Sequence, residues 1–280
     1  MSFDVSIGQY YESNSIIHKL DPRSKLFYVV MYIVAIFVAK DVYAFAALTA
    51  ICVLTIVISR VPVRVVLKGL KPLIAIVLFT AIINMFITVG EGEPLFSLPI
   101  IPDKWSLTLY VEGLYRAGVL TLRIIILVVE TSLFFSYCTT PIELTDGIES
   151  ALTPLKLIKI PVHEFAMMMT IALRFIPTLV DETTKIMNAQ KARGASFSTG
   201  GLIKRAKALI PIIIPLFVSS FRRAEELATA MECRCYHGGK GRTRMNKLRM
   251  RIKDYFCLLL SCGILVGVIF INIYANGFKI

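Results

Sequence analysis

Long apolar runs with few charged residues constrain this chain more than any other feature of its sequence. A helix needs about 20 apolar residues to cross the roughly 30 Å hydrocarbon core of a bilayer. The composition agrees, because 56% of the residues are hydrophobic and 18% are charged, against about 45–50% and about 25% in soluble domains. We therefore predict an all-α membrane protein with about five transmembrane helices. The runs are Leu26–Ala39, Val42–Ser59, Leu73–Val89, Leu107–Tyr137 and Tyr255–Ile273.

The first run is short for a membrane span. As a helix, Leu26–Ala39 would measure roughly 21 Å, which is less than the thickness of the hydrocarbon core. We expect this helix to be tilted against others or only partly inserted, and to form a hairpin with the next run through Lys40-Asp41. Asp21-Pro22 marks its start, since Asp is a favourable N-cap and Pro suits the first helical position.

The charges predict how the chain is oriented. The chain has 31 Lys+Arg and 19 Asp+Glu, and cytoplasmic loops of membrane proteins are enriched in basic residues. A basic loop with Arg60, Arg64, Lys68 and Lys71, and the basic stretch 240–253, are therefore expected in the cytoplasm, and the acidic loop Gly90–Ser106 outside. The polar start of the chain lacks a signal-peptide pattern, so we expect a cytoplasmic N-terminus. We do not expect nucleic-acid binding, because no aromatic-basic module accompanies the charge.

Ionisable residues interrupt the fourth run at spacings of four, seven and seven: Glu112, Arg116, Arg123 and Glu130. These spacings place all of them on one helical face. A charged residue at the bilayer centre is costly when it faces lipid, so this stripe should face protein or water. Two interpretations stay open: an ion or proton relay, and a buried polar stripe that fixes helix packing.

Two long segments are apolar in one half and polar in the other. The first is predicted as a helix from about Val162 to Arg193 and the second from about Leu202 to Arg234. Their apolar halves, Phe165–Val180 and Leu209–Ser220, are too short to span a bilayer. We interpret both as helices that start within the membrane protein and run into the cytoplasm, bent at Pro177, Pro211 and Pro215.

Both segments end in a similar way. The first ends in Ala192-Arg193-Gly194 and the second in Cys233-Arg234-Cys235, each with an Ala four residues before the Arg. Small neighbours leave a guanidinium accessible, and its fork of donors suits a carboxylate. The pattern predicts two related docking sites on a cytoplasmic partner, and Gly194 suits a helix C-cap. The alternative is that each Arg only complements the negative end of its helix dipole.

The quoted pieces resemble the transmembrane T component of energy-coupling factor (ECF) transporters, the EcfT and CbiQ group. The resemblance covers most of the chain in the family's order. It rests on His18-Lys19-Leu20-Asp21-Pro22-Arg23-Ser24-Lys25, Thr139-Thr140-Pro141 through Asp146-Gly147, Pro161-Val162-His163-Glu164, Leu173-Arg174-Phe175-Ile176-Pro177, Ala192-Arg193-Gly194 and Arg222-Arg223-Ala224-Glu225-Glu226-Leu227-Ala228 leading to Arg234.

The resemblance implies an L-shaped helical protein in a bacterial or archaeal cell membrane. Residues 1–137 and 254–280 would form its transmembrane region, and residues 138–253 its cytoplasmic coupling helices. The implied partners are two ABC ATPases of the EcfA type, as a heterodimer or homodimer, and a membrane S component that binds a vitamin or a transition-metal ion. Arg193 and Arg234 would each dock in one ATPase. The residues implied to support the coupling helices are Arg174, Pro177, Glu182, Pro215, Arg223 and Glu225.

The resemblance also implies that this chain binds no cofactor and that ATP and Mg are held by the partner ATPases. The chain has no phosphate-binding Gly-Lys-Ser/Thr loop, so we do not expect it to be an enzyme. The second docking triplet departs from the family's usual Ala-Arg-Gly, because Cys235 stands where Gly is usual. One alternative is a conventional permease that binds substrate in its own core. Another is a metalloprotein with Cys233, Cys235 and His237 as ligands.

Overall fold

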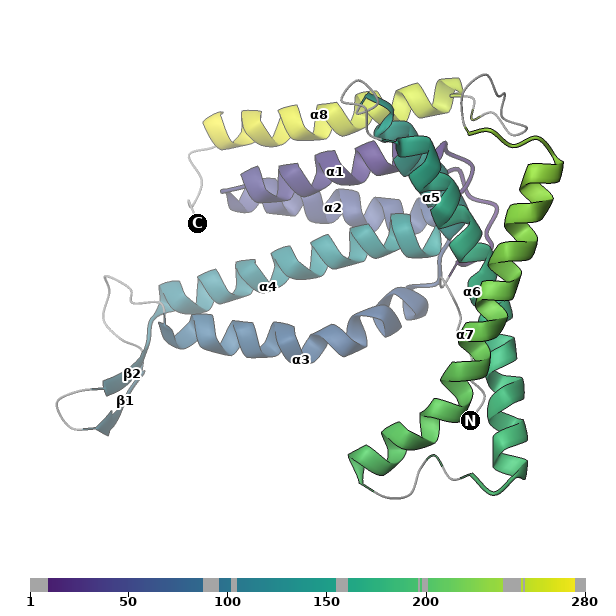
Figure 1. Cartoon of the computed structure of the whole chain (residues 1–280). Coiled ribbons are helices and arrows are strands. Elements are labelled where there is room, and N and C mark those ends of the chain that lie inside the picture. The colour runs from purple at the N-terminus through teal and green to yellow at the C-terminus, as the bar shows by residue number, and fades with distance from the viewer. Residues whose placement is uncertain are drawn as a thin grey trace. The chain divides into compact units, whose positions relative to one another are not determined.

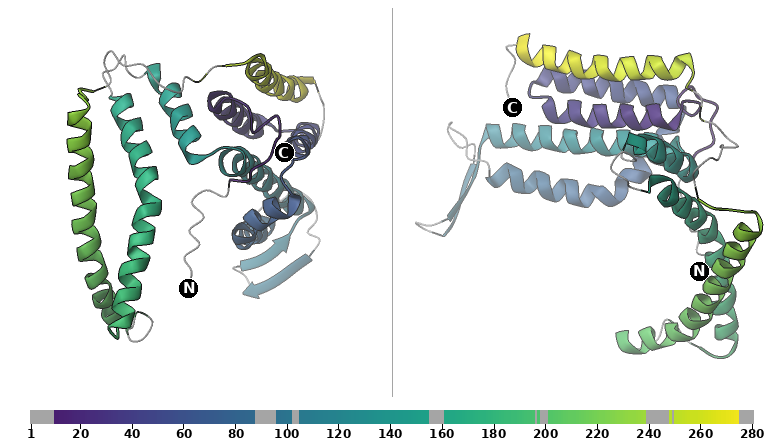
Figure 2. Two further views of the ribbon diagram at one scale, coloured as in Figure 1. Left: turned by 90° about the vertical axis from the view of Figure 1, so that its right-hand side faces the viewer. Right: turned by 45° about the horizontal axis from the view of Figure 1, so that its top comes forward.

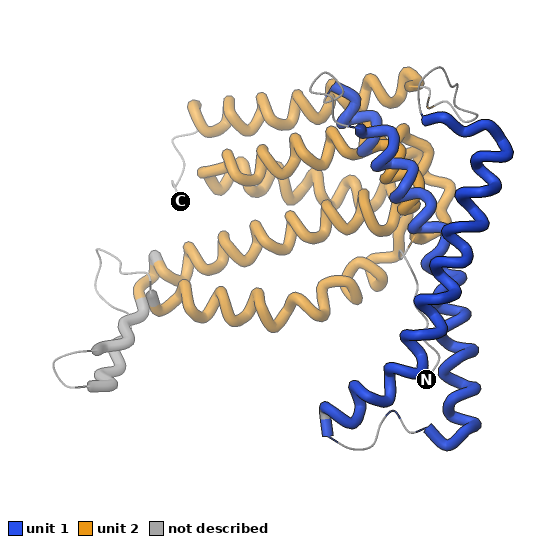
Figure 3. Tube along the Cα trace, in the orientation of Figure 1, with its two compact units in different colours: residues 1–7, 148–247 blue, residues 8–147, 248–280 orange. Residues whose placement is uncertain are grey.

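The computed structural model describes residues 10–87, 96–101, 105–154, 161–195, 197, 201–238, 248 and 250–274. The chain divides into two compact units (Figure 3): unit 1 contains residues 1–7 and 148–247, and unit 2 contains residues 8–147 and 248–280. The elements are α1 (Pro22–Val38), α2 (Val42–Ser59), α3 (Val63–Ile87), β1 (Phe96–Ile101), β2 (Trp105–Leu109), α4 (Val111–Ser132), the π-helical turn η1 (Leu133–Tyr137), α5 (Pro141–Ala151), α6 (Val162–Ala192), α7 (Leu202–Cys233) and α8 (Ile252–Tyr274).

The predicted helical membrane class is confirmed. Among the described helices, four are long and apolar enough to cross a membrane, and they are α2, α3, α4 and α8. Helix α1 has 17 residues and begins where predicted, with the Asp21 side chain accepting a hydrogen bond from the Arg23 N–H. These helices lie roughly side by side in unit 2 (Figures 1 and 2).

Two predicted loops contain regular structure. The basic segment that holds Arg64, Lys68 and Lys71 belongs to α3, so its prediction as a loop was wrong. Val66, Leu67 and Leu70 recur there at helical spacing, and this apolar pattern continues the helix through the charges. The predicted loop Gly90–Ser106 contributes to a two-stranded antiparallel hairpin of β1 and β2.

The core of unit 2 explains how the short helix α1 is accommodated. Helix α1 contacts α8 as well as α4 and η1, and five of its apolar or aromatic residues are almost completely buried: Tyr28, Val29, Tyr32, Ala35 and Ile36. The Tyr28 ring stacks on Phe134 with centroids 4.7 Å apart, and the Tyr32 hydroxyl donates to the Leu48 carbonyl at 2.7 Å. One face of α1 is therefore buried in protein, whereas Val30, Val34 and Phe37 on its other face are exposed. Packing against the neighbouring helices, rather than length alone, holds this short helix in the bundle.

Buried polar contacts join the start of α1 to α8 and to the end of η1. The Asp254 carboxylate accepts hydrogen bonds from the Asp21 N–H at 2.7 Å and from the Ser24 hydroxyl at 3.2 Å. The buried Lys25 ammonium donates to the carbonyls of His18 at 3.1 Å and Cys138 at 2.8 Å. Buried polar groups need such partners, and these contacts therefore fix one end of the helices in unit 2.

Candidate docking site

Helices α6 and α7 end in the same hydrogen-bonding pattern. Arg193 and Arg234 follow the last helical residue directly, with φ of −83° and −91°. The next residue has positive φ in both cases, 88° at Gly194 and 55° at Cys235. The four bonds that close the ends run from Gly194 N to Lys191 O (2.9 Å), Ala195 N to Gln190 O (3.0 Å), Cys235 N to Glu232 O (2.8 Å) and Tyr236 N to Met231 O (3.0 Å). Both ends are therefore Schellman motifs.

The second end keeps this geometry without glycine. The expectation that Gly194 caps α6 is confirmed, and Cys235 adopts the same left-handed conformation at the end of α7. For a residue with a Cβ, that conformation costs roughly 1–2 kcal/mol. The hydrogen bonds of the cap therefore outweigh the backbone strain at Cys235.

The two helix ends are accessible. The predicted docking residues Ala192, Arg193, Gly194, Cys233, Arg234 and Cys235 are all exposed. Among the ion pairs of the described residues, none involves Arg193 or Arg234. Both guanidinium groups are thus positioned, beside small residues, to bind a carboxylate on another surface.

An ion pair joins α6 to α7, which lie side by side and run in opposite directions (Figures 1 and 2). The Arg223 guanidinium donates to a Glu182 carboxylate oxygen at 2.7 Å. A hydrogen bond from Ser219, and then the positive charge of Arg223, lower the pKa of Glu182. Both residues were predicted to support these helices, but not as a pair.

This ion pair has the same position relative to both helix ends. Glu182 and Arg223 are 41 positions apart, and so are Arg193 and Arg234. Each Arg at a helix end follows its member of the pair by eleven residues, or about 16 Å of helix. Because the helices run in opposite directions, the two ends lie on opposite sides of the pair. An alignment of the two segments at this offset would have revealed the ion pair, because Asp181-Glu182 then aligns with the oppositely charged Arg222-Arg223.

The other predicted support residues lie along the same helices. Pro177 is inside α6, and Pro211 and Pro215 are inside α7. Both helices continue through their prolines, and α7 changes direction in its first half (Figure 1). Arg174 of α6 and Glu225 of α7 are exposed. They therefore lie on the surface of the helix pair.

Apolar side chains are exposed over the halves of α6 and α7 that the sequence identifies as apolar. Aromatic, Met, Leu, Ile and Val residues contribute, and several are more than half exposed. Such a surface is unfavourable in water and marks a site for protein or lipid. The residues are Phe165, Met168 and Met169 of α6 and Leu209, Ile210, Ile213, Ile214, Phe217 and Val218 of α7, together with Phe221, which directly follows the apolar half of α7.

The ionisable stripe of α4 divides into separate environments. Glu112 is in the helix, but its side chain lies outside the described residues, and Arg116 is exposed. Arg123 donates to the Ala39 carbonyl at 3.2 Å and lies over the Phe45 ring, 5.0 Å from its centroid. Glu130 is buried and contacts Tyr28 and Thr55. These contacts link α4 to α1 and α2.

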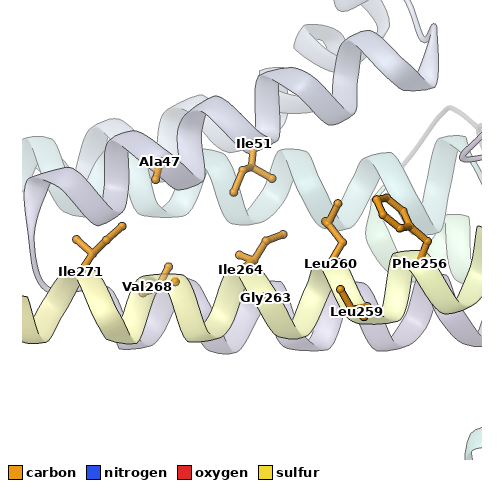
Figure 4. A pocket seen from close by; sticks show the side chains of 10 residues that line it. Ala47, Ile51, Phe256, Leu259, Leu260, Gly263, Ile264, Val268 and Ile271 are labelled. Atoms are coloured by element: carbon orange, nitrogen blue, oxygen red, sulfur yellow. The ribbon is translucent and has the colours of Figure 1, made fainter.

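Grooves in unit 2 are relevant to the permease alternative. One, of about 460 Å³, lies between α2 and α8 (Figure 4). Its lining is entirely apolar, with Ala47 and Ile51 opposite Leu260, Ile264 and Val268. A second groove of about 340 Å³ between α3 and α4 has Thr121 as its only polar lining residue. Substrate sites place polar groups for orientation and specificity, so neither groove favours binding of a polar substrate.

Comparisons with known proteins agree with these observations. The profile of a family described as "Cobalt transport protein" (CbiQ) matches residues 13–245. Three similar proteins are each named "Energy-coupling factor transporter transmembrane protein EcfT". The Clostridium kluyveri protein is 50% identical over 259 residues, which are 92% of this chain and 93% of that protein. The Ruminiclostridium cellulolyticum protein is 51% identical over 246 residues (88% and 89%).

The Bacillus subtilis protein is 45% identical over 264 residues, which cover 94% of this chain and 96% of that protein. Identity at this level extends over the bundle of unit 2 and over α6 and α7. The chain therefore belongs to the CbiQ/EcfT family of energy-coupling factor transporter transmembrane proteins.

Proposed function

We propose that this chain is the energy-coupling subunit of an ECF-type ABC importer for a vitamin or a transition-metal ion. It passes the motion of two ATPases through α6 and α7 to a separate substrate-binding membrane subunit. The observation that carries this proposal is the pair of accessible Arg residues at matched helix ends. The printed names of the relatives, energy-coupling factor transporter transmembrane proteins, support it.

The proposed ATPase contacts use Arg193 and Arg234. Each side chain enters a groove of one ATPase subunit and pairs with a carboxylate there, while the small neighbours allow close approach. ATP and Mg are bound by these ATPases. The two Arg residues lie on opposite sides of the Glu182–Arg223 pair, so one ATPase can hold each end of the helix pair.

The proposed contact with the substrate-binding subunit is the exposed apolar surface of α6 and α7. Burying apolar surface contributes roughly 25 cal/mol per Å², and a membrane protein offers the apolar partner surface that this contact needs. Closure of the ATPases on ATP would move the helix ends and shift this surface. The substrate-binding subunit would then release its substrate into the cytoplasm.

The test combines Arg193→Ala and Arg234→Ala. Loss of an Arg buried in a partner groove costs on the order of 2–5 kcal/mol, which weakens docking by roughly 30-fold or more. We expect the double variant to reach the membrane but to lose co-purification with the ATPases and ATP-driven uptake. Lys185→Ala and Arg222→Ala are the controls, because both are exposed basic residues on the same helices away from their ends. Normal assembly and uptake by the double variant would refute the proposal.

A further inference from the structure

Glu130 occupies a buried position where three helices meet. It belongs to α4, inside the candidate membrane span Gly113–Tyr137, and only 1% of it is exposed. One carboxyl oxygen, Oε1, lies 3.1 Å from the Tyr28 hydroxyl of α1. The other, Oε2, lies 3.1 Å from the Thr55 hydroxyl of α2.

No cation of the described residues pairs with Glu130. The titratable groups close enough to interact electrostatically with Glu130 are Tyr28 and Tyr32 of α1, Cys52 of α2 and Cys138 after η1, and none of these groups is positively charged. Arg123, two turns earlier in α4, directs its guanidinium to the Ala39 carbonyl and the Phe45 ring. The Lys25 ammonium bonds to two carbonyls. An ionised carboxylate here would therefore be buried without a counter-charge, which is costly.

The hydroxyl protons around Glu130 can be counted. Tyr28 has one, and it can donate to Oε1. Thr55 also has one, but its oxygen lies 2.8 Å from the Cys52 carbonyl as well as 3.1 Å from Glu130 Oε2. A carbonyl only accepts, and Thr in a helix commonly donates to the carbonyl three or four residues earlier. If Thr55 donates to Cys52, the contact between Thr55 and Oε2 needs a proton from Glu130.

We propose that Glu130 is a proton-binding site and carries a proton on Oε2 in the folded protein. Each of the three hydroxyl protons, on Tyr28, Glu130 and Thr55, then makes one hydrogen bond. Tyr28 donates to Oε1, Oε2–H donates to Thr55, and Thr55 donates to the Cys52 carbonyl. This chain of hydrogen bonds connects α1, α4 and α2. The groups that form it carry no net charge.

The test is infrared spectroscopy of the whole protein in lipid vesicles at pH 7, where an ordinary Glu with a pKa of about 4.3 is ionised. A protonated carboxyl and a carboxylate give separate bands. We expect the wild-type spectrum to lose one protonated-carboxyl band in Glu130→Gln. Loss of carboxylate bands alone would overturn the proposal. Asp41→Asn is the matched control, because Asp41 is another buried acid in this bundle, and its carboxyl oxygens, unlike those of Glu130, have no hydrogen bond among the described residues.

A second variant keeps the carboxyl in place. In Tyr28→Phe, Oε1 loses its donor, so the carbonyl band assigned to Glu130 should shift to higher frequency while its protonated character remains. This shift identifies the band even if Glu130→Gln does not fold. A Tyr28→Phe spectrum with no shifted protonated-carboxyl band would contradict the proposal. Glu130→Gln should also keep a Tm close to wild type, because its amide can accept from Tyr28 and donate to Thr55, whereas Glu130→Leu should lower Tm clearly.

Discussion

The bundle of unit 2 and the pair formed by α6 and α7 differ in how many of their apolar side chains are buried within the protein. In the bundle, aromatic and aliphatic residues of α1, α2 and η1 form a contiguous core. In the helix pair, the buried apolar residues among those that the structure describes are Val162, Ala166 and Ile212. Helices of such length would bury a full apolar stripe if they belonged to a self-sufficient domain.

The difference indicates which region is completed by other molecules. Several polar groups inside the bundle bond to one another, as Asp254 does with Asp21 and Ser24. The helix pair instead leaves apolar side chains and two arginines accessible. A surface that is both apolar and exposed is expected to gain its remaining stability from binding partners.

The largest expected effect separates the two regions directly. Phe134 is 2% exposed and stacks on Tyr28, whereas Phe217 of α7 is 62% exposed. Phe134→Ala should cost about 3–5 kcal/mol, and Phe217→Ala should change the stability of the isolated protein by about 0.5 kcal/mol or less. Thermal unfolding of the purified chain in detergent measures both changes. Equal losses of Tm would show that the helix pair has a core of its own and would contradict the contrast between the two regions.

For assembly, the order of the two effects should be reversed: Phe217→Ala should have the larger effect and Phe134→Ala the smaller. Phe217→Ala removes part of the exposed apolar surface and should weaken co-purification with a substrate-binding subunit. Phe134→Ala should leave the affinity of the protein that remains folded unchanged. Co-purification at equal amounts of folded protein measures this. Wild-type recovery with Phe217→Ala would argue against this surface as the contact.

Much of the fold follows from local sequence signals, and the site follows in part. Asp21-Pro22 predicts the start of α1, and apolar runs predict the helices, because capping and hydrophobic periodicity are local. The contact between Glu182 and Arg223 depends on the register of two helices, which single-segment patterns do not contain. The left-handed conformation of Cys235 was also beyond prediction, since that conformation favours Gly and the cap hydrogen bonds determine it here.

A smaller effect concerns the two ends of the helix pair. Cys235→Gly removes the Cβ from a residue with φ of 55°, so it should stabilise the end of α7 by about 1 kcal/mol. Gly194→Ala introduces a Cβ at φ of 88° and should destabilise the end of α6 by a similar amount. Hydrogen exchange of the last-turn amides measures each local change. Faster exchange near Arg234 in Cys235→Gly would contradict the interpretation of the two ends as equivalent caps.

The smallest expected effect tests the contact at which α6 and α7 are joined. The Glu182–Arg223 pair is partly exposed, so Glu182→Gln should cost at most about 1 kcal/mol. The pKa of Glu182 is lowered in the folded protein from its ordinary 4.5, so the contribution of the pair is complete above pH 4.5 and is lost as the pH falls through the lower, folded-state pKa. A double-mutant cycle with Arg223→Gln, read by hydrogen exchange in α6 and α7, measures the coupling. Glu226→Gln controls for removal of an exposed charge from the helix pair. A coupling of zero at pH 7, or one that grows as the pH is lowered, would show that this ion pair does not hold the two helices together.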